Sequence, residues 1–246
     1  MIVVALSIAL ILCCALEFLF VPWFLKAMWP NPSKKSLLLK MICASLFVAV
    51  GVLSIYVADN FSVFAMMMLV GLIFGWIGDF FLHVNTTFIC FCIGFANFLI
   101  GHIVYIAAYI KTLGIMFPEY NQINIIEIAA LILLSFVAVL VFVKLKLKMP
   151  AKWMYFFIGL YFLILAIMFI KATALGYNYM CSGVPFGWCA LTVLCLGSLN
   201  FFVSDVLIGV IMFSDRKKNY PLKKVNIATY FAAQVLLATS ILFVKG

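Results

Sequence analysis

The chain has 246 residues, of which 69% are hydrophobic and 9% charged. A typical soluble domain is about half apolar and about a quarter charged, so this composition excludes a soluble globular domain and a disordered chain. Sixteen Lys and Arg against seven Asp and Glu give a net charge of +9, which in so apolar a chain is interpreted first as membrane topology. The sequence predicts an integral membrane protein.

Eight apolar runs are long enough to cross a bilayer, which takes about 20 residues in a helix. In chain order they cover residues 2–25, 36–57, 61–82, 86–110, 122–143, 153–175, 186–213 and 225–244. Each run is continuously apolar, which favours helices over the alternating strands of a membrane barrel. The predicted fold is all-α: a polytopic membrane protein with eight transmembrane helices in a single domain, residues 1–246.

The positive charges predict how these helices are oriented. Thirteen of the sixteen follow the first, fifth and seventh runs, and the other three are Lys111, Lys171 and Lys245. With eight helices, the three connections rich in Lys and Arg lie on the same side of the membrane. The positive-inside rule makes that side cytoplasmic, so both termini are expected outside the cytoplasm. Lysines next to the ends of membrane helices attract anionic lipid head groups, so membrane lipids are expected partners and nucleic acid is not. No pattern in the chain indicates an oligomeric state.

Ionisable side chains inside membrane helices are costly and mark functional sites. Asp79 ends the third run, beside a face of small residues made by Gly71, Gly75 and Gly78, and Asp205 lies in the seventh run. These two aspartates are the candidate catalytic residues. The side chains expected to bind or orient a ligand beside them are Glu17, Asn97, His102, Tyr105, Asn200, Ser204, Tyr230 and Gln234.

The depth of these groups follows from the rise of a helix. Counted from the cytoplasmic ends, Asp79 lies about 5–8 Å deep, Asp205 and Glu17 about 12 Å, and His102 about 24 Å, nearer the outer side. The count predicts one polar cavity that opens toward the cytoplasmic leaflet.

Neither a metal nor a cofactor is expected. The chain has two histidines and eight cysteines but no HExxH, no CxxC, no P-loop and no dinucleotide-binding fingerprint.

The polar segments resemble the lysoplasmalogenase (YhhN-like) family of membrane proteins. The resemblance rests on four motifs in order: Gly78-Asp79; Gly94, Phe98 and His102-Ile-Val-Tyr105; Gly197-Ser-Leu-Asn-Phe-Phe-Val-Ser204-Asp205; and Tyr230-Phe-Ala-Ala-Gln234 followed by Thr239-Ser240. Length and span count also agree, so the likeness covers essentially the whole chain. The first connection departs from it, because the family commonly has a Lys-Pro pair where this chain has Pro30-Asn-Pro32-Ser-Lys34-Lys35.

The resemblance implies a lysophospholipid substrate and hydrolysis of the vinyl ether bond of lysoplasmalogens. The products are a fatty aldehyde and glycerophosphoethanolamine or glycerophosphocholine. This chemistry needs a carboxylic acid to protonate the β-carbon and a carboxylate to activate water, a division of labour analogous to that in glycosidases. Spacing leaves open which aspartate takes which role; the deeper Asp205 is favoured as the acid and Asp79 as the base.

Two other classes of protein also place charges inside a helix bundle. A small transporter would commonly show internal repeats and helices interrupted in mid-membrane, and no convincing repeat relates residues 1–120 to residues 121–246. A non-catalytic lipid-binding protein would tolerate isosteric changes of the aspartates. Both stay open as alternatives to the hydrolase.

Overall fold

In the computed structural model, residues 2–84, 87–145, 147, 152–214 and 219–245 are described, and they form eight α-helices and no strand. The helices are α1 (Ile2–Met28), α2 (Lys34–Ala58), α3 (Val63–Val84), α4 (Phe88–Met116), α5 (Ile125–Lys144), α6 (Lys152–Cys181), α7 (Gly187–Phe213) and α8 (Tyr220–Thr239), and a 3₁₀ turn, η1 (Ser240–Leu242), follows α8. Seven are long and apolar enough to cross a membrane, and α5 has the shorter apolar stretch Ile125–Val141. The protein is an integral, multi-pass membrane protein.

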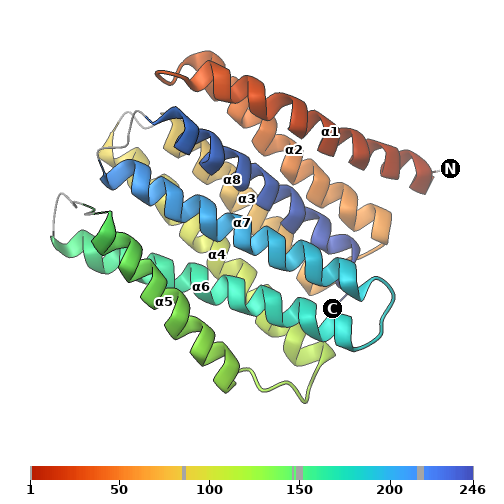
Figure 1. Cartoon of the computed structure of the whole chain (residues 1–246). Helices are drawn as coiled ribbons and strands as arrows, with labels where there is room; N and C mark the ends of the chain where they lie inside the picture. The colour runs from red at the N-terminus through yellow and green to blue at the C-terminus, as the bar shows by residue number, and fades with distance from the viewer. Residues whose placement is uncertain (1, 85–86, 146, 148–151, 215–218, 246) are drawn as a thin grey trace.

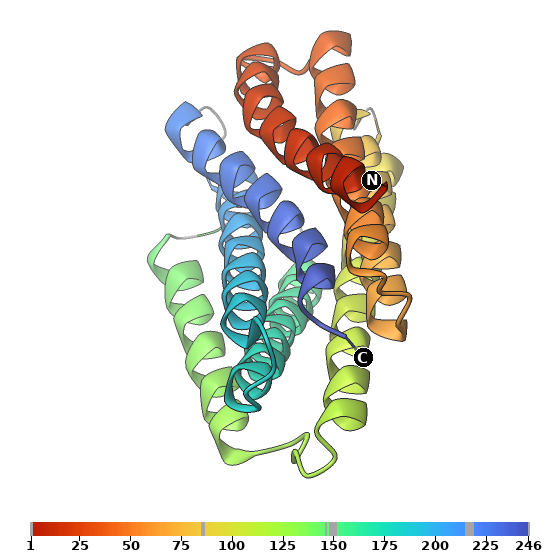
Figure 2. The ribbon, with the colours of Figure 1, turned by 90° about the vertical axis from the view of Figure 1, so that its right-hand side faces the viewer.

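The helices alternate in direction across the bundle. α1 and α2 lie at one edge and α5 at the opposite edge, where it packs on α6 (Figures 1 and 2). Both termini lie at the same end of the bundle (Figure 1). The other end holds the C-terminal ends of α1, α3, α5 and α7 and the N-terminal ends of α2, α4, α6 and α8; we call it the lysine-rich end.

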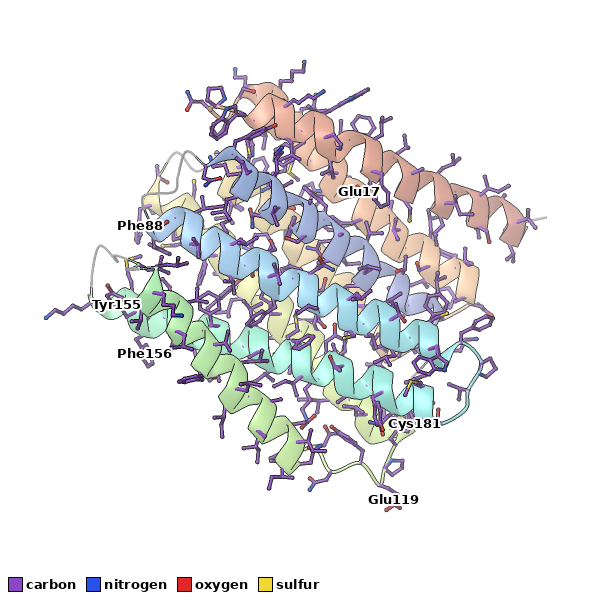
Figure 3. All side chains as sticks on the ribbon, in the orientation of Figure 1. Glu17, Phe88, Glu119, Tyr155, Phe156 and Cys181 are labelled. Carbon is purple, nitrogen blue, oxygen red and sulfur yellow. The ribbon has the colours of Figure 1, made fainter. Side chains whose placement is uncertain are left out.

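Most of the charges behind the predicted orientation flank these helix ends. The described ones are Lys26, Lys34, Lys35, Lys40, Lys144, Lys152, Lys223 and Lys224. Lys146, Lys148, Arg216, Lys217 and Lys218 lie outside the described residues. In Figure 3, Phe88 and Tyr155 mark the lysine-rich end, and Glu119 and Cys181 mark the opposite end.

Polar caps, rather than the edges of the apolar runs, decide where several helices begin. α8 starts five residues before the predicted run, because the Asn219 side chain accepts a hydrogen bond from the Leu222 amide and Pro221 occupies the first turn. α2 starts with a capping box between Ser33 and Ser36. Counting apolar residues alone therefore does not predict where these helices begin.

The glycine face of α3 lets two other helices approach closely. A Cβ atom on Gly71 would lie 2.2 Å from the Tyr105 ring of α4, and one on Gly75 would lie 2.6 Å from Gln234 Nε2 of α8. Any larger residue at either position would displace a buried polar side chain. The small residues therefore bring α4 and α8 against the helix that carries Asp79.

A polar cluster at the end opposite the lysine-rich end joins α5 to α6. Lys171 Nζ lies 2.8 Å from Glu127 Oε2 and also donates to the main-chain oxygen of Gln122. The Tyr120 hydroxyl donates to Glu127 Oε1 at 2.6 Å. Burial, with the neighbouring carboxylate adding to it, raises the pKa of Tyr120, so its hydroxyl remains a donor. The cluster anchors the α4–α5 connection far from the aspartates.

Candidate active site

Asp79 and Asp205 line one cavity of about 440 Å³ near the lysine-rich end. Its polar wall comprises Lys40, Asp79, His83, Ser204, Asp205, Lys223, Asn226 and Tyr230. The remaining wall is mainly apolar, with side chains such as Phe24, Phe98 and Ile208. A larger cavity of about 780 Å³, lined mainly by α5 and α6, has no charged residue among those that line it. The first cavity is therefore the candidate site.

Asp79 pairs with a cation inside this cavity. Lys40 Nζ lies 2.8 Å from Asp79 Oδ1, and it also donates to the main-chain oxygen of Asp79 at 3.2 Å. The Tyr230 hydroxyl donates to Asp79 Oδ2 at 2.7 Å. Asp79 is 1% exposed, so both carboxylate oxygens exchange water for protein donors. An ammonium group and a hydroxyl together stabilise the carboxylate.

A short hydrogen-bond chain holds Tyr230 in place. Gln234 Nε2 donates to the Tyr230 hydroxyl at 3.0 Å, and the Tyr105 hydroxyl donates to Gln234 Oε1 at 3.4 Å. All three side chains are buried. The chain runs from α4 through α8 to Asp79 on α3, and it orients the tyrosine that contacts the carboxylate.

Asp205 has a different set of partners. The Tyr161 hydroxyl of α6 donates to Asp205 Oδ2 at 2.5 Å, and His102 Nε2 lies 3.3 Å from the same oxygen. His102 Nε2 also lies 3.1 Å from the Tyr161 hydroxyl. Among the described residues His102 Nδ1 has no partner, so the tautomer with its proton on Nε2 satisfies the contact to Asp205. Asp205 thus has hydrogen-bond donors but no lysine beside it.

Ser204 connects α7 to α8 beside the second aspartate. Asn226 Nδ2 donates to the Ser204 main-chain oxygen at 2.7 Å and to Ser204 Oγ at 3.0 Å. Ser204 Oγ donates back to the main-chain oxygen of Asn226 at 3.2 Å. This reciprocal set fixes the relative position of the helices that carry Asp205 and Tyr230.

Two predicted members of the site lie elsewhere. Asn97 Nδ2 donates to the Ile93 carbonyl and Asn200 Nδ2 to the Leu196 carbonyl, each at 2.8 Å within its own helix. Neither is among the residues that line the cavity. An asparagine side chain at a partly exposed helix position can donate to a main-chain carbonyl on the preceding turn of its own helix. Its presence in a polar stripe therefore does not make it part of a cavity.

Glu17 is buried but does not line the cavity. It is 4% exposed, and Figure 3 shows it on the side of α1 that faces the bundle. Among the described residues, neither of its carboxyl oxygens has a hydrogen-bond partner. It lies about two helical turns before Phe24, which together with Met28 is the part of α1 that lines the cavity.

The depth estimate for His102 is wrong. It places the imidazole nearer the outer side than Asp205, whereas the structure puts the two side chains in contact. The count assumes helices perpendicular to the membrane plane that begin at their apolar edges, but the helices are inclined to one another (Figure 2). The error therefore comes from tilt and helix ends.

Two side chains that contact the aspartates are missing from the sequence-based set. From the sequence, Lys40 is taken only as one of the positive charges that predict membrane orientation. In the structure it lies in the second turn of α2 and contacts Asp79. Tyr161 lies on an apolar helix with no polar stripe around it. The position of Lys40 inside an apolar run is a usable signal; nothing in the local sequence marks Tyr161.

The described residues contain no group of three or more His, Cys, Asp or Glu side chains placed to hold a metal ion. At Asp79 the neighbouring cation is the ammonium group of Lys40.

The comparison with protein families gives a match over most of the chain. The model of the YhhN family matches residues 35–241. The chain belongs to the YhhN family. This is the family of lysoplasmalogenases, and the match includes both aspartates and Lys40, whereas α1 with Glu17 lies outside it. No curated protein and no solved structure gives a significant match.

Proposed function

We propose that this protein is a lysoplasmalogenase, which hydrolyses the vinyl ether bond of a lysoplasmalogen. The products are a fatty aldehyde and glycerophosphoethanolamine or glycerophosphocholine. The observation that carries the proposal is the placement of Asp79 and Asp205 in one cavity with different partners, a lysine for the first and a tyrosine and a histidine for the second. Family membership supports the same reaction.

The reaction needs one acid, one base and one water molecule. The acid protonates the β-carbon of the vinyl ether, and the double-bond electrons form the new C–H bond, leaving an oxocarbenium ion. Water adds to the cationic carbon and loses a proton to the base. The hemiacetal hydroxyl then gives up its proton as the glycerol oxygen takes one up and leaves, which releases the aldehyde. The proton held by the base returns to the acid through water. One water is consumed for each bond broken.

Asp205 suits the acid. Both of its hydrogen bonds reach Oδ2, and no donor among the described residues contacts Oδ1. Oδ1 therefore remains to carry the transferable proton, while Tyr161 and His102 hold the carboxyl group in position.

Asp79 suits the base. The Lys40 ammonium group stabilises its negative charge, so the carboxylate is available to face the developing oxocarbenium ion and to accept a proton from water. Each oxygen keeps a further lone pair after its contact with Lys40 or Tyr230. Tyr230, held by Gln234, orients the carboxylate within the cavity.

The cavity belongs to the half of the bundle near the lysine-rich end. Its wall includes Pro32, His83 and Lys223, which lie close to the helix ends there. The positive-inside rule assigns that end to the cytoplasm. We therefore place the site toward the cytoplasmic leaflet, with both termini on the opposite side.

The test is aldehyde release by purified protein in neutral detergent. Lysoplasmalogen should give equal amounts of aldehyde and glycerophospho product, and the saturated 1-O-alkyl analogue should give neither, because it lacks the double bond that the acid protonates. Binding of both lipids without any product would instead identify a lipid-binding protein. Release of free fatty acid from an ester lysophospholipid would identify a different hydrolase.

A further inference from the structure

Within the described part of the chain, one lysine that lines the cavity has no carboxylate to neutralise it. Lys223 of α8 lines the cavity, and within the described part of the chain no carboxylate oxygen lies at ion-pair distance from its ammonium group. The Trp29 ring lies 5.4 Å from Lys223 Nζ. A ring face holds a cation in place but leaves its charge uncompensated. Among the described residues, Lys223 is therefore oriented by the ring and able to pair with an anion.

Lys40 offers a second donor on the wall contributed by α2. An ammonium group has three N–H donors, and Lys40 directs two of them to the Oδ1 and main-chain oxygens of Asp79. One donor remains. Both lysines line the cavity that contains the two aspartates, so an anion bound between them lies beside the reacting groups.

We propose that Lys223 and Lys40 bind the phosphodiester of a lysophospholipid head group. This proposal adds a binding site for the head group to the proposed function. It depends on that function only for the statement that the reacting bond is a vinyl ether. The phosphodiester carries one negative charge and unhindered acceptor oxygens, which match one uncompensated ammonium group and one spare donor. In a lysoplasmalogen only the glycerol carbons separate this phosphate from the vinyl ether. Binding the phosphate at the mouth therefore directs the ether inward, toward Asp79 and Asp205.

Lys224 provides a matched control. It is the next residue along α8, and its ammonium group lies 5.1 Å from the Tyr220 ring, a setting much like that of Lys223. It is exposed and is not among the residues that line the cavity. Substituting either lysine removes the same charge at the same helix end, but only one substitution changes the cavity.

The test measures binding of two lipids that cannot be hydrolysed, a 1-O-alkyl lysophosphatidylethanolamine and the corresponding 1-O-alkylglycerol without phosphate. In neutral detergent, Lys223→Gln should weaken binding of the phospholipid by about 10- to 100-fold, as expected for the loss of one charged hydrogen bond. Binding of the alkylglycerol should not change. Lys224→Gln should leave both affinities at the wild-type value, and Lys223→Arg should largely restore binding of the phospholipid.

Three results would overturn the proposal. Equal losses for the two lipids in Lys223→Gln would show a general packing defect, and equal effects of Lys223→Gln and Lys224→Gln would show a surface-charge effect. Competition of phosphatidylglycerol with the alkyl lysophospholipid at similar affinity would show that the lysines bind anionic bilayer lipid. Because neither probe is a substrate, these outcomes are independent of whether lysoplasmalogen is hydrolysed.

Discussion

Replacing Asp79 by asparagine removes a negative charge that faces a largely buried cation. The side chain of Lys40 is 14% exposed and that of Asp79 is 2% exposed, so the ammonium group in the variant has little access to water. Removing one partner of a buried ion pair typically costs about 3–5 kcal/mol. Asp79→Asn should therefore lower both stability and turnover, and its loss of activity alone would not show a catalytic role.

The double variant Asp79→Asn/Lys40→Met separates the two effects. Methionine resembles lysine in length and carries no charge, so the asparagine no longer faces an unpaired cation. Replacing both partners of a buried pair is often close to neutral for stability. We expect the double variant to recover most of the stability lost in the single variant. Turnover should remain at least about 10²-fold below wild type, because the general base is still absent.

The assay combines thermal unfolding in detergent with aldehyde release at saturating lysoplasmalogen. Asp59→Asn is the matched control: it makes the same chemical change at the C-cap of α2, where φ is 47°, a left-handed conformation that asparagine tolerates well. A double variant that is stable and retains more than about a tenth of wild-type turnover would contradict the role of Asp79 as the base. An Asp79→Asn variant as stable as wild type would contradict the buried ion pair.

Three further predictions concern other parts of the molecule. Asp205→Asn should keep the hydrogen bonds from Tyr161 and His102, fold normally and lose about 10²- to 10⁴-fold in aldehyde release; near-wild-type release would exclude Asp205 as the acid. Lys171→Met leaves the partly buried Glu127 without its cation and should lower the unfolding temperature, while kcat/KM at the temperature of full folding stays unchanged. Reporter fusions after Gly246 and in the connection between α7 and α8 should report opposite sides of the membrane, with the connection in the cytoplasm. A cytoplasmic C-terminus would refute the orientation.

The helical architecture follows from the sequence because apolar length is a local property. A helix needs about 20 apolar residues to cross a bilayer, and such runs can be counted without knowing their neighbours. The ends are less predictable. α4 continues to Met116, past Lys111, because a lysine stem can lie along the helix while its amine reaches a more polar zone.

The site was predictable where polar residues recur at helical spacing. Tyr230 and Gln234 are four residues apart on α8, and both reach the hydrogen-bond chain that ends at Asp79. Asn200, by contrast, belongs to a similar stripe yet satisfies its amide on its own helix. Spacing shows which residues share a face; the rotation of that face toward the core or the lipid depends on packing between helices.

The partners of the aspartates were not predictable from local pattern, because they come from distant parts of the chain. Lys40 and Asp79 are 39 residues apart, and Tyr161 and Asp205 are 44 apart. Each pair depends on which helices become neighbours and at what height. The sequence therefore identifies the two carboxyl groups, but the structure is needed to distinguish the one beside a lysine from the one beside a tyrosine and a histidine.

Lys40 contributes both to membrane orientation and to the ion pair with Asp79, and a mutation can separate these two effects. It is one of thirteen positive charges at the lysine-rich connections, and it is also the cation beside Asp79. Orientation depends on the sum of the charges, so loss of one among thirteen should leave the topology unchanged. The site depends on this particular ammonium group, because it lies 2.8 Å from a carboxylate that has little access to water. A Lys40→Met protein with wild-type orientation and impaired turnover would therefore assign the defect to the cavity rather than to insertion.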